Sequence, residues 1–304
     1  MPQESNAQPV IAIVGAGAVG GLLAALLERA GVNVVAVARP ETARAIATDG
    51  LTIRSRHFGD GLSRVPAVTS IPVGAGVIIA TKAFALPAVA DDIRAAHPTE
   101  VVSLLNGIEH LGVLRAAAPN TLVAGASVAV ETTRLGPTLI EHRSPFLRLT
   151  VPAHAADSVI TAAWRAAGLE VTVGGTDEDV LWSKLRFLAP LALLTSYWRL
   201  PAGAAVVRDP DLTGALLAEI AAIATHDGVP TEAAKLARAL AALPPMMRSS
   251  LQNDLEAGRE SELDAIGGAL VRRARSAGVA SATLERLVLD LASTQPAGPA
   301  TSQG

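Results

Sequence analysis

A glycine-rich loop near the N-terminus is the first feature of the sequence that can do chemistry. It reads Gly15-Ala16-Gly17-Ala18-Val19-Gly20, between an apolar run with strand character and a stretch with helical character. In a G-x-G-x-x-G loop the first glycine permits a tight turn, the second leaves room for a pyrophosphate, and the third lets the helix pack closely on the strand. The following helix offers free N–H groups to phosphates. The loop predicts dinucleotide binding, and its context disfavours the alternative of a turn without a ligand.

The end of the second apolar run predicts which dinucleotide binds. NAD enzymes usually place Asp or Glu there to bind the ribose 2′-hydroxyl. This run ends Val37-Ala38-Arg39-Pro40, with no carboxylate at its tip. The planar guanidinium of Arg39 can pair with a 2′-phosphate, although an arginine at a strand end can also simply be solvated. The missing acid favours NADPH.

Several shorter motifs follow in a fixed order. They are Thr81-Lys82-Ala83, Asn106-Gly107, Trp182-Ser183-Lys184-Leu185, Ser249-Ser250 and Glu262-Leu263-Asp264. None of them is specific alone, but the ordered set resembles the ketopantoate reductase (2-dehydropantoate 2-reductase) family over residues 10–291. The resemblance implies a Rossmann domain, a helical C-terminal domain, and reduction of 2-dehydropantoate to pantoate by NADPH, a step of pantothenate biosynthesis.

The resemblance also implies roles for individual residues. Lys184 matches the family's catalytic lysine, and Glu262 matches its catalytic-site glutamate. Asn106 matches an asparagine that contacts the lysine and the substrate, and we expect it at the cofactor as well. Lys82 matches a lysine at the edge shared by cofactor and substrate. Ser250 matches a serine that binds the substrate carboxylate.

The chemistry of a ketone reduction is consistent with a lysine acid. Hydride transfer builds negative charge on the carbonyl oxygen, which then needs a proton and a nearby positive charge. The ammonium of Lys184 can supply both, and its apolar neighbours Trp182 and Leu185 are expected to lower its pKa. The alternative is an exposed lysine that extends from a helix into water.

The other candidates also have ordinary structural explanations. Glu262 lies in a charge-rich stretch that can be a solvated helix start, and Asn106-Gly107 is a common turn sequence. Lys82 and Ser250 can equally be a loop lysine and a helix-surface serine. For Asn106 and Lys82, the functional interpretation gains support because both follow predicted strands, at the sheet edge where ligands bind in such folds.

Two positions depart from the family pattern. The family usually carries asparagines four and eight residues after the catalytic lysine, where this chain has Leu188 and Ala192. Those asparagines hold polar groups of the substrate, and a site that lacks them loses hydrogen-bond partners. The departures therefore predict the same chemistry on a more apolar substrate.

The elements that must position these residues alternate in the first half of the chain. Strands are expected at 10–14, 32–37, 77–80 and 101–105, with helices at 19–30, 40–47 and 84–96. Strand and helix in repeated order predict a parallel sheet covered by helices. Residues 51–68, with a Gly59-Asp60-Gly61 turn, are expected to form a hairpin inserted into that sheet. Further strands are expected at 123–130, 138–141, 147–151 and 170–173.

The second half is predicted to be helical. Helices are expected at 179–194, 211–227, 231–243, 246–256, 262–276 and 282–292. Asp211, Thr231 and Ser281 occupy expected N-cap positions, and Gly228 and Gly278 follow expected helix ends. These patterns predict an α/β fold with a Rossmann-type domain over residues 1–175, a helical substrate domain over 176–294, and a disordered tail over 295–304.

Composition narrows the function classes. The net charge of −3 and pI of about 6.1 argue against a nucleic-acid partner. The chain has no cysteine, and its six histidines show no ligand spacing, so we expect no metal site. The first residues lack signal-peptide order and no apolar run spans a membrane, so a cytoplasmic enzyme is expected. The apolar helices after Glu178 can either form a domain core or bury a homodimer interface.

Three functions are consistent with the sequence. The first is ketopantoate reduction, and the second is reduction of another 2-keto acid or a related carbonyl or imine compound. The third is a non-catalytic NADPH-binding sensor, because fold alone does not determine function. The joint presence of Lys184, Asn106 and Glu262 argues against the sensor.

Overall fold

The computed structural model describes residues 9–294, and the tail predicted at 295–304 lies outside them. The chain divides into two compact units. One contains the residues up to Leu105 together with His110–Val180, and the other contains Asn106–Glu109 together with the residues from Leu181 onward. The short segment carrying Asn106 therefore belongs with the C-terminal part of the chain. Among the described residues, no helix is long and apolar enough to cross a membrane.

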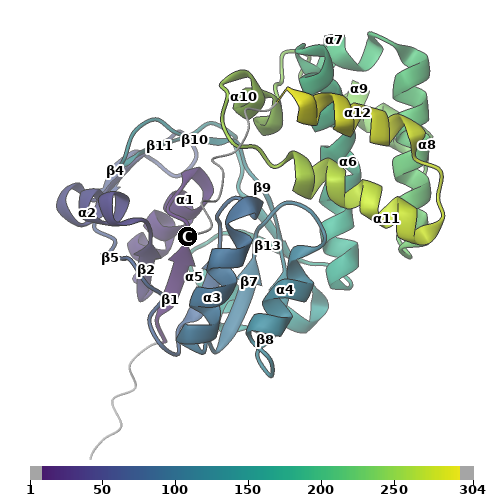
Figure 1. Ribbon diagram of the computed structural model, residues 1–304. Coiled ribbons are helices and arrows are strands. Elements are labelled where there is room, and N and C mark those ends of the chain that lie inside the picture. The colour runs from purple at the N-terminus through teal and green to yellow at the C-terminus, as the bar shows by residue number, and fades with distance from the viewer. Residues whose placement is uncertain (1–8, 295–304) are drawn as a thin grey trace, which may run out of the picture. The chain divides into compact units, whose positions relative to one another are not determined.

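A parallel sheet of six strands forms the centre of the first unit (Figure 1). Its spatial order is β5 (Ala67–Val68), β2 (Val34–Val37), β1 (Ile11–Val14), β6 (Gly76–Ile79), β7 (Glu100–Ser103) and β8 (Leu122–Gly125). Strands β1, β2, β6 and β7 are buried along their whole length, as expected for a sheet covered on both faces. The strand order reverses between β1 and β6, which is the point where ligands bind in such sheets. The predicted α/β Rossmann-type fold is confirmed.

The helices of this unit connect the strands. They are α1 (Ala18–Arg29), α2 (Pro40–Asp49), η1 (Ala83–Ala85), α3 (Leu86–Ala96), α4 (His110–Ala117), η2 (Ala153–Ala155) and α5 (Val159–Ala166). Helices α3 and α4 pack side by side on the sheet (Figure 1). Helices α4 and α5 were not among the predicted elements, and both are short.

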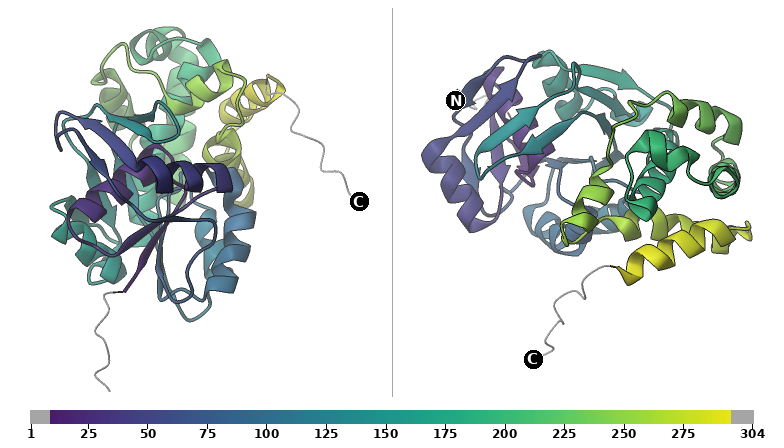
Figure 2. Two further views of the ribbon diagram at one scale, coloured as in Figure 1. Left: turned by 90° about the vertical axis from the view of Figure 1, so that its left-hand side faces the viewer. Right: turned by 90° about the horizontal axis from the view of Figure 1, so that it is seen from above.

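The hairpin expected within the sheet lies elsewhere. Strands β3 (Leu51–Ser55) and β4 (Gly61–Ser63) do pair antiparallel, but they join β10 (Thr132–Arg134) and β11 (Leu139–His142) in a separate sheet of four strands. This sheet lies against α1 (Figure 2), where a Cβ built on Gly21 would meet Ile140 Cδ1 at 2.4 Å. The prediction was wrong about the partner because β11, which pairs with β3, follows it much later in the chain, with Leu139 opposite Thr52.

Another predicted strand is two strands in the structure, and the second of them belongs to a third sheet. The expected strand at 123–130 is two strands: β8 in the parallel sheet, and β9 (Ser127–Ala129) beside β12 (Arg148–Val151) and β13 (Glu170–Val173). The chain changes sheet at Gly125, whose N–H donates to Asp177 Oδ1 at 2.6 Å. An apolar run alone does not reveal such a change of partner.

The second unit is helical. Its elements are the later part of α6 (Asp177–Trp198), α7 (Ala202–Val207), α8 (Pro210–His226), α9 (Ala233–Ala241), α10 (Ser250–Glu256), η3 (Asp264–Gly268), α11 (Ala269–Ala277) and α12 (Ala282–Ser293). Residues 191–196 of α6 are all buried, which makes this helix the centre of the core (Figure 1). As predicted, the described residues after Glu178 contain no strand.

Helix starts were predicted less well than helix ends. Gly228 and Gly278 adopt positive φ after helices, as expected. Asp209, two residues before the predicted cap, accepts from the Leu212 N–H at 3.0 Å, because Pro210 takes the first helical position. The helix predicted from Met246 begins only at Ser250, because the Ser249 side chain caps it. The start predicted at Thr231 shifts, with Glu232 as N-cap.

A buried histidine makes the first unit sensitive to acid. His110, at the start of α4, is 4% exposed, and neither ring nitrogen has a hydrogen-bond partner among the described residues. Burial, and secondly the charge of Arg115, lower the pKa of His110 to about 4. Between pH 6.5 and pH 4, His110 is therefore protonated in the unfolded chain and neutral in the folded chain.

We predict that acid destabilises the protein through His110. Between pH 6.5 and pH 4 the free energy of unfolding should fall by roughly 3 kcal/mol more in the wild type than in His110→Leu. Denaturant titrations at stepped pH measure this difference. Burial raises the pKa of Glu100, which acts in the opposite direction, but Glu100 is common to both proteins. Parallel stability curves for the two proteins would contradict the prediction.

Candidate functional site

The glycine loop joins β1 to α1 and touches the loop after β6. Gly15 adopts φ +99°, and a Cβ built there would lie 2.8 Å from Thr81 N. A Cβ on Gly20 would lie 2.1 Å from Gly15 O and 3.0 Å from Ala80 Cβ. The positive φ of Gly15 agrees with the tight turn predicted for the first position, and the lack of space at Gly20 agrees with the close packing predicted for the third.

The second glycine of the loop faces open space. A Cβ built on Gly17 would meet no atom within 4 Å, although Gly17 is the N-cap of α1. No side chain caps this helix and its first turn holds no acidic residue. The first N–H groups of α1 are thus left for another acceptor, and Thr81 Oγ1 beside the loop is buried without a hydrogen-bond partner in residues 9–294. These features fit a bound pyrophosphate.

Two arginines approach each other beside this loop. Arg39 is the exposed N-cap residue of α2, and its side chain makes no hydrogen bond or ion pair with another described residue. Arg134, on β10, donates to Gly136 O at 3.0 Å and to Pro137 O at 2.7 Å. Burial, and secondly the charge of Arg39, lower the pKa of Arg134. Arg134 was not a predicted site residue, because its strand contacts α1 only through a sheet that the sequence does not predict.

Lys82 lies at the carboxyl edge of β6, as predicted. It is half-buried and immediately precedes the short helix η1. Its role at the cofactor or substrate stays a prediction.

In the second unit, two predicted site residues meet directly. Asn106 Nδ2 donates to Glu262 Oε2 at 3.0 Å, across 156 positions of sequence. Glu262 is 5% exposed, so its carboxylate is not part of a solvated helix start. The other amide atom, Asn106 Oδ1, is buried without a hydrogen-bond partner among the described residues. The pair thus presents a buried acceptor that no described protein group satisfies.

A single turn of π-helix holds this pair in place. The predicted helix at 262–276 begins as η3, a π-helix, and continues as α11. A Cβ on Gly107 would lie 2.5 Å from Ala265 O, so only glycine lets the Asn106 segment approach η3 this closely. Arg272 reinforces the contact, because it donates to Glu109 Oε2 at 2.6 Å and to Asp264 Oδ1 at 2.7 Å. π-Helical turns are common at functional sites.

Helix α6 carries Lys184 and packs against the same π-helix. A Cβ on Gly267 would lie 3.3 Å from Leu193 Cδ2. Trp182, 1% exposed, fixes the helix near Lys184, because its Nε1 donates to Asp227 Oδ2 at 3.0 Å. Lys184 itself is half-buried. Lys184, Asn106 and Glu262 therefore belong to one compact unit and surround one core.

The positions that depart from the family pattern lie along the same helix. Leu188, one turn beyond Lys184, is half-buried, and Ala192 is fully buried. Ser250 is the exposed first residue of α10, next to the capping Ser249. Its role toward a substrate carboxylate stays a prediction.

Comparison with known proteins identifies the family. Residues 11–155 match the family described as "Ketopantoate reductase PanE/ApbA", and residues 178–293 match "Ketopantoate reductase PanE/ApbA C terminal". The chain belongs to the ketopantoate reductase family. It is thus an oxidoreductase of the 2-dehydropantoate 2-reductase-like class, as the motifs had suggested.

Individual relatives cover most of the chain. A 2-dehydropantoate 2-reductase of Archaeoglobus fulgidus is 27% identical, covering 92% of this chain and 96% of its own. The "Uncharacterized oxidoreductase YkpB" of Bacillus subtilis is also 27% identical, with the same coverage. The crystal structure of a PanE/ApbA family ketopantoate reductase from Ralstonia eutropha has a TM-score of 0.85 at 29% identity, covering 94% of this chain and 98% of that one. A D-mandelate dehydrogenase with NADH and anilino(oxo)acetate has a TM-score of 0.82 at 19% identity, covering the same shares, and shares the fold.

We predict that alanine weakens dinucleotide binding at one position of the glycine loop and destabilises the fold at another. Gly17→Ala should change the free energy of unfolding by no more than about 0.5 kcal/mol, because its Cβ enters open space, yet weaken dinucleotide binding at least about tenfold. Gly20→Ala should destabilise the fold by about 1–3 kcal/mol or more, because its Cβ overlaps Gly15 O. Denaturant unfolding and fluorescence titration with NADPH measure both effects. Unchanged binding in Gly17→Ala would show that no phosphate lies over the loop.

Proposed function

We propose that this protein uses NADPH to reduce a 2-keto acid to the corresponding 2-hydroxy acid. The observation that carries the proposal is the buried bond from Asn106 to Glu262, in the same unit as Lys184, with Asn106 Oδ1 left as an orphan acceptor. A structural amide would be satisfied by its neighbours, whereas this one retains an acceptor for a ligand or a catalytic donor.

Each predicted site residue of the second unit has a role in the proposed reaction. When bound, the nicotinamide supplies the hydride to the carbonyl carbon. Lys184 donates the proton that the carbonyl oxygen needs, and its positive charge stabilises the oxygen before the transfer. Glu262 holds Asn106 by accepting from its Nδ2, so that Oδ1 is oriented toward a donor on the substrate or on Lys184. Ser250 is the proposed donor to the substrate carboxylate.

The substrate next to Lys184 is proposed to be more apolar than 2-dehydropantoate. Leu188 follows Lys184 by one helical turn and offers only methyl groups. A site that would hydrogen-bond a substrate hydroxyl through an asparagine here cannot do so. A 2-keto acid with a branched hydrocarbon chain matches such a surface, and 2-dehydropantoate is the second candidate because relatives of this chain carry that name.

The cofactor site is proposed to select NADPH through two arginines. Arg39 has no protein partner among the described residues, and Arg134 approaches it without a carboxylate bonded to either guanidinium. A 2′-phosphate would neutralise this local positive charge and pair with the planar guanidinium groups. The 2′-hydroxyl of NADH offers no such charge.

Removal of these arginines should alter cofactor preference. Arg39→Ala is expected to weaken NADPH binding about tenfold to a hundredfold while the affinity for NADH stays the same, because only NADPH loses a charge-assisted contact. Arg134→Ala should act in the same direction. Arg143→Ala, which removes an exposed arginine paired with Glu141, is the matched control. If the two cofactors lose affinity equally, the arginines do not recognise the 2′-phosphate.

Lys184→Ala should separate catalysis from cofactor binding. We expect turnover to fall at least about a hundredfold, because the proton donor is lost, with the dissociation constant of NADPH unchanged. NADPH oxidation is followed with 2-dehydropantoate and with branched, apolar 2-keto acids. Lys235→Ala, an exposed lysine paired with Glu232, serves as the control.

Two outcomes of that experiment would contradict the proposal. Unchanged turnover in Lys184→Ala would remove the lysine from the reaction. Tight NADPH binding by the wild type without turnover of any keto acid would favour the alternative of a non-catalytic sensor.

A further inference from the structure

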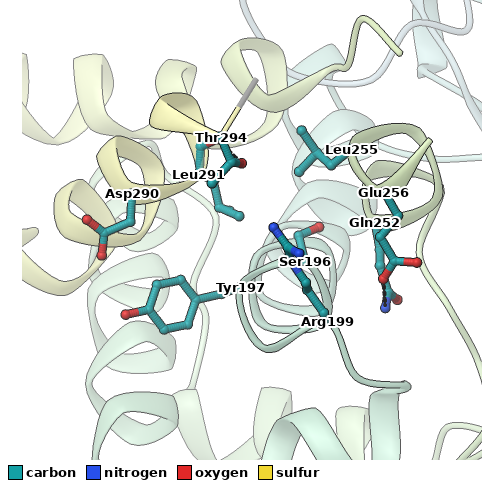
Figure 3. A pocket seen from close by; sticks show the side chains of 9 residues that line it. All are labelled: Ser196, Tyr197, Arg199, Gln252, Leu255, Glu256, Asp290, Leu291 and Thr294. Carbon is teal, nitrogen blue, oxygen red and sulfur yellow. Dashed lines mark hydrogen bonds between the residues drawn. The ribbon is translucent and has the colours of Figure 1, made fainter. Parts of the chain in front are cut away.

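A hollow in the helical unit is lined by residues that the proposed reaction does not use. It has a volume of about 270 Å³ and is lined by residues of α6, α10 and α12 (Figure 3). The lining residues are Ser196, Tyr197, Arg199, Gln252, Leu255, Glu256, Asp290, Leu291 and Thr294. Lys184, Asn106, Glu262 and Ser250 are absent from this lining. Ser196 lies three helical turns beyond Lys184 along α6.

Two buried polar atoms at this cavity, Gln252 Oε1 and Ser196 Oγ, lack a hydrogen-bond partner among the described residues. Gln252 is fully buried, and its Nε2 donates to Glu256 Oε1 at 2.9 Å, but its Oε1 accepts nothing among the described residues. Ser196 is 5% exposed, and its Oγ also has no partner. The neighbouring Thr195, by contrast, is satisfied by Leu191 O and Ser249 Oγ. Because each orphan costs about 1–3 kcal/mol, two in one cavity need an explanation.

An arginine with an uncommon backbone conformation completes the cavity. Arg199 follows the last residue of α6 at φ +54°, a left-handed conformation in which glycine or asparagine is usual. Its guanidinium end reaches toward the space between Leu255 and Leu291 (Figure 3). It forms no hydrogen bond or ion pair with another described residue, so the strained turn directs an uncompensated charge into the cavity.

The remaining charges leave this arginine dominant. Glu256 pairs with Arg248 and accepts from Gln252, so its charge is compensated. The carboxylate of Asp290 and the phenol of Tyr197 point away from the space that Arg199 enters (Figure 3). The cavity therefore presents the guanidinium of Arg199, the hydroxyl of Ser196, and Gln252 Oε1, which can accept a hydrogen bond.

We propose that this cavity binds a small monocarboxylic acid that carries a hydroxyl or amino group. The carboxylate would pair with the Arg199 guanidinium and accept from Ser196 Oγ. The hydroxyl or amino group would donate to Gln252 Oε1, and the hydrocarbon part would contact Leu255 and Leu291. The volume is below the about 300–1,000 Å³ of drug-sized sites, which limits the ligand to a small molecule. The proposal does not rest on the proposed reductase activity.

Binding measurements test the proposal directly. Isothermal titration calorimetry of the full chain with L-valine and with 2-hydroxyisovalerate is expected to give saturable binding. Because 2-hydroxyisovalerate is also a product of the kind that the proposed reaction forms, its titration is repeated on Lys184→Ala, in which binding at the cavity should persist. Isovalerate, which lacks the donor, and isobutanol, which lacks the carboxylate, should each bind at least about tenfold more weakly. The proposal would be overturned if neither acid bound at a concentration of about 10 mM.

Two variants place the ligand in this cavity. Arg199→Asn keeps a residue that tolerates the left-handed turn but removes the guanidinium, and it should weaken binding at least about tenfold. Arg238→Asn, at an exposed arginine of α9 outside the cavity, should leave binding unchanged. Binding that survives Arg199→Asn but is lost in Lys184→Ala would place the acid at the proposed reaction site and overturn the inference.

Removal of the orphan hydroxyl provides an independent readout. Ser196→Ala should weaken binding and leave the Tm of the ligand-free protein unchanged or raised, because an unsatisfied buried group disappears. Thr195→Val should lower the Tm, because its hydroxyl is satisfied. A clear drop of Tm in Ser196→Ala would show that the hydroxyl already has a partner, such as ordered water, and would contradict the proposal.

A shortened chain tests whether the protein fills its own cavity. Thr294, the last described residue, lies at the cavity, and ten residues follow it. A variant lacking residues 295–304 is expected to bind the acid with unchanged affinity. A gain of more than about tenfold on truncation would identify the terminal segment as the occupant and overturn the proposal.

Discussion

The hydrogen bond from Asn106 Nδ2 to Glu262 Oε2, at 3.0 Å, joins two parts of the chain that sequence separates by 156 positions. A carboxylate that is 5% exposed has lost most of its water and depends on such a donor. The close contact of Gly107 with Ala265, and the π-helical turn after Glu262, both serve this approach. Because of it, a segment that follows a Rossmann strand is built into the helical unit.

The dinucleotide loop follows a different constraint, which is steric. Gly15 and Gly20 are required because backbone and Ala80 lie where their side chains would be, whereas Gly17 borders empty space. One short motif thus contains two positions where packing requires glycine and one where it does not, which is the position proposed to face the dinucleotide. Arg39 and Arg134 add a local positive charge beside it. Within the loop of residues 15–20, the glycines that packing requires are therefore different from the glycine proposed for binding.

Besides Trp198 Nε1, the described residues of the helical unit contain orphan polar atoms at two places. Asn106 Oδ1 is associated with the residues of the proposed reaction, and Ser196 Oγ and Gln252 Oε1 line a separate cavity. Most of the surrounding core is hydrocarbon, in which an orphan polar atom is costly. Their retention in a well-packed core is the physical reason for assigning ligands to both places.

The sequence by itself determined the local features: the parallel strands and helices of the first half, the helices of the second, and the spacing of the glycine loop. These follow from hydrophobic periodicity and backbone sterics, which act over a few residues. Only the tertiary structure decided that β3 and β4 leave the main sheet, that Arg134 approaches Arg39, and that Ser196 and Gln252 share a cavity. Each of these depends on contacts between distant segments, and the pattern of one segment carries no information about which distant surface will cover it.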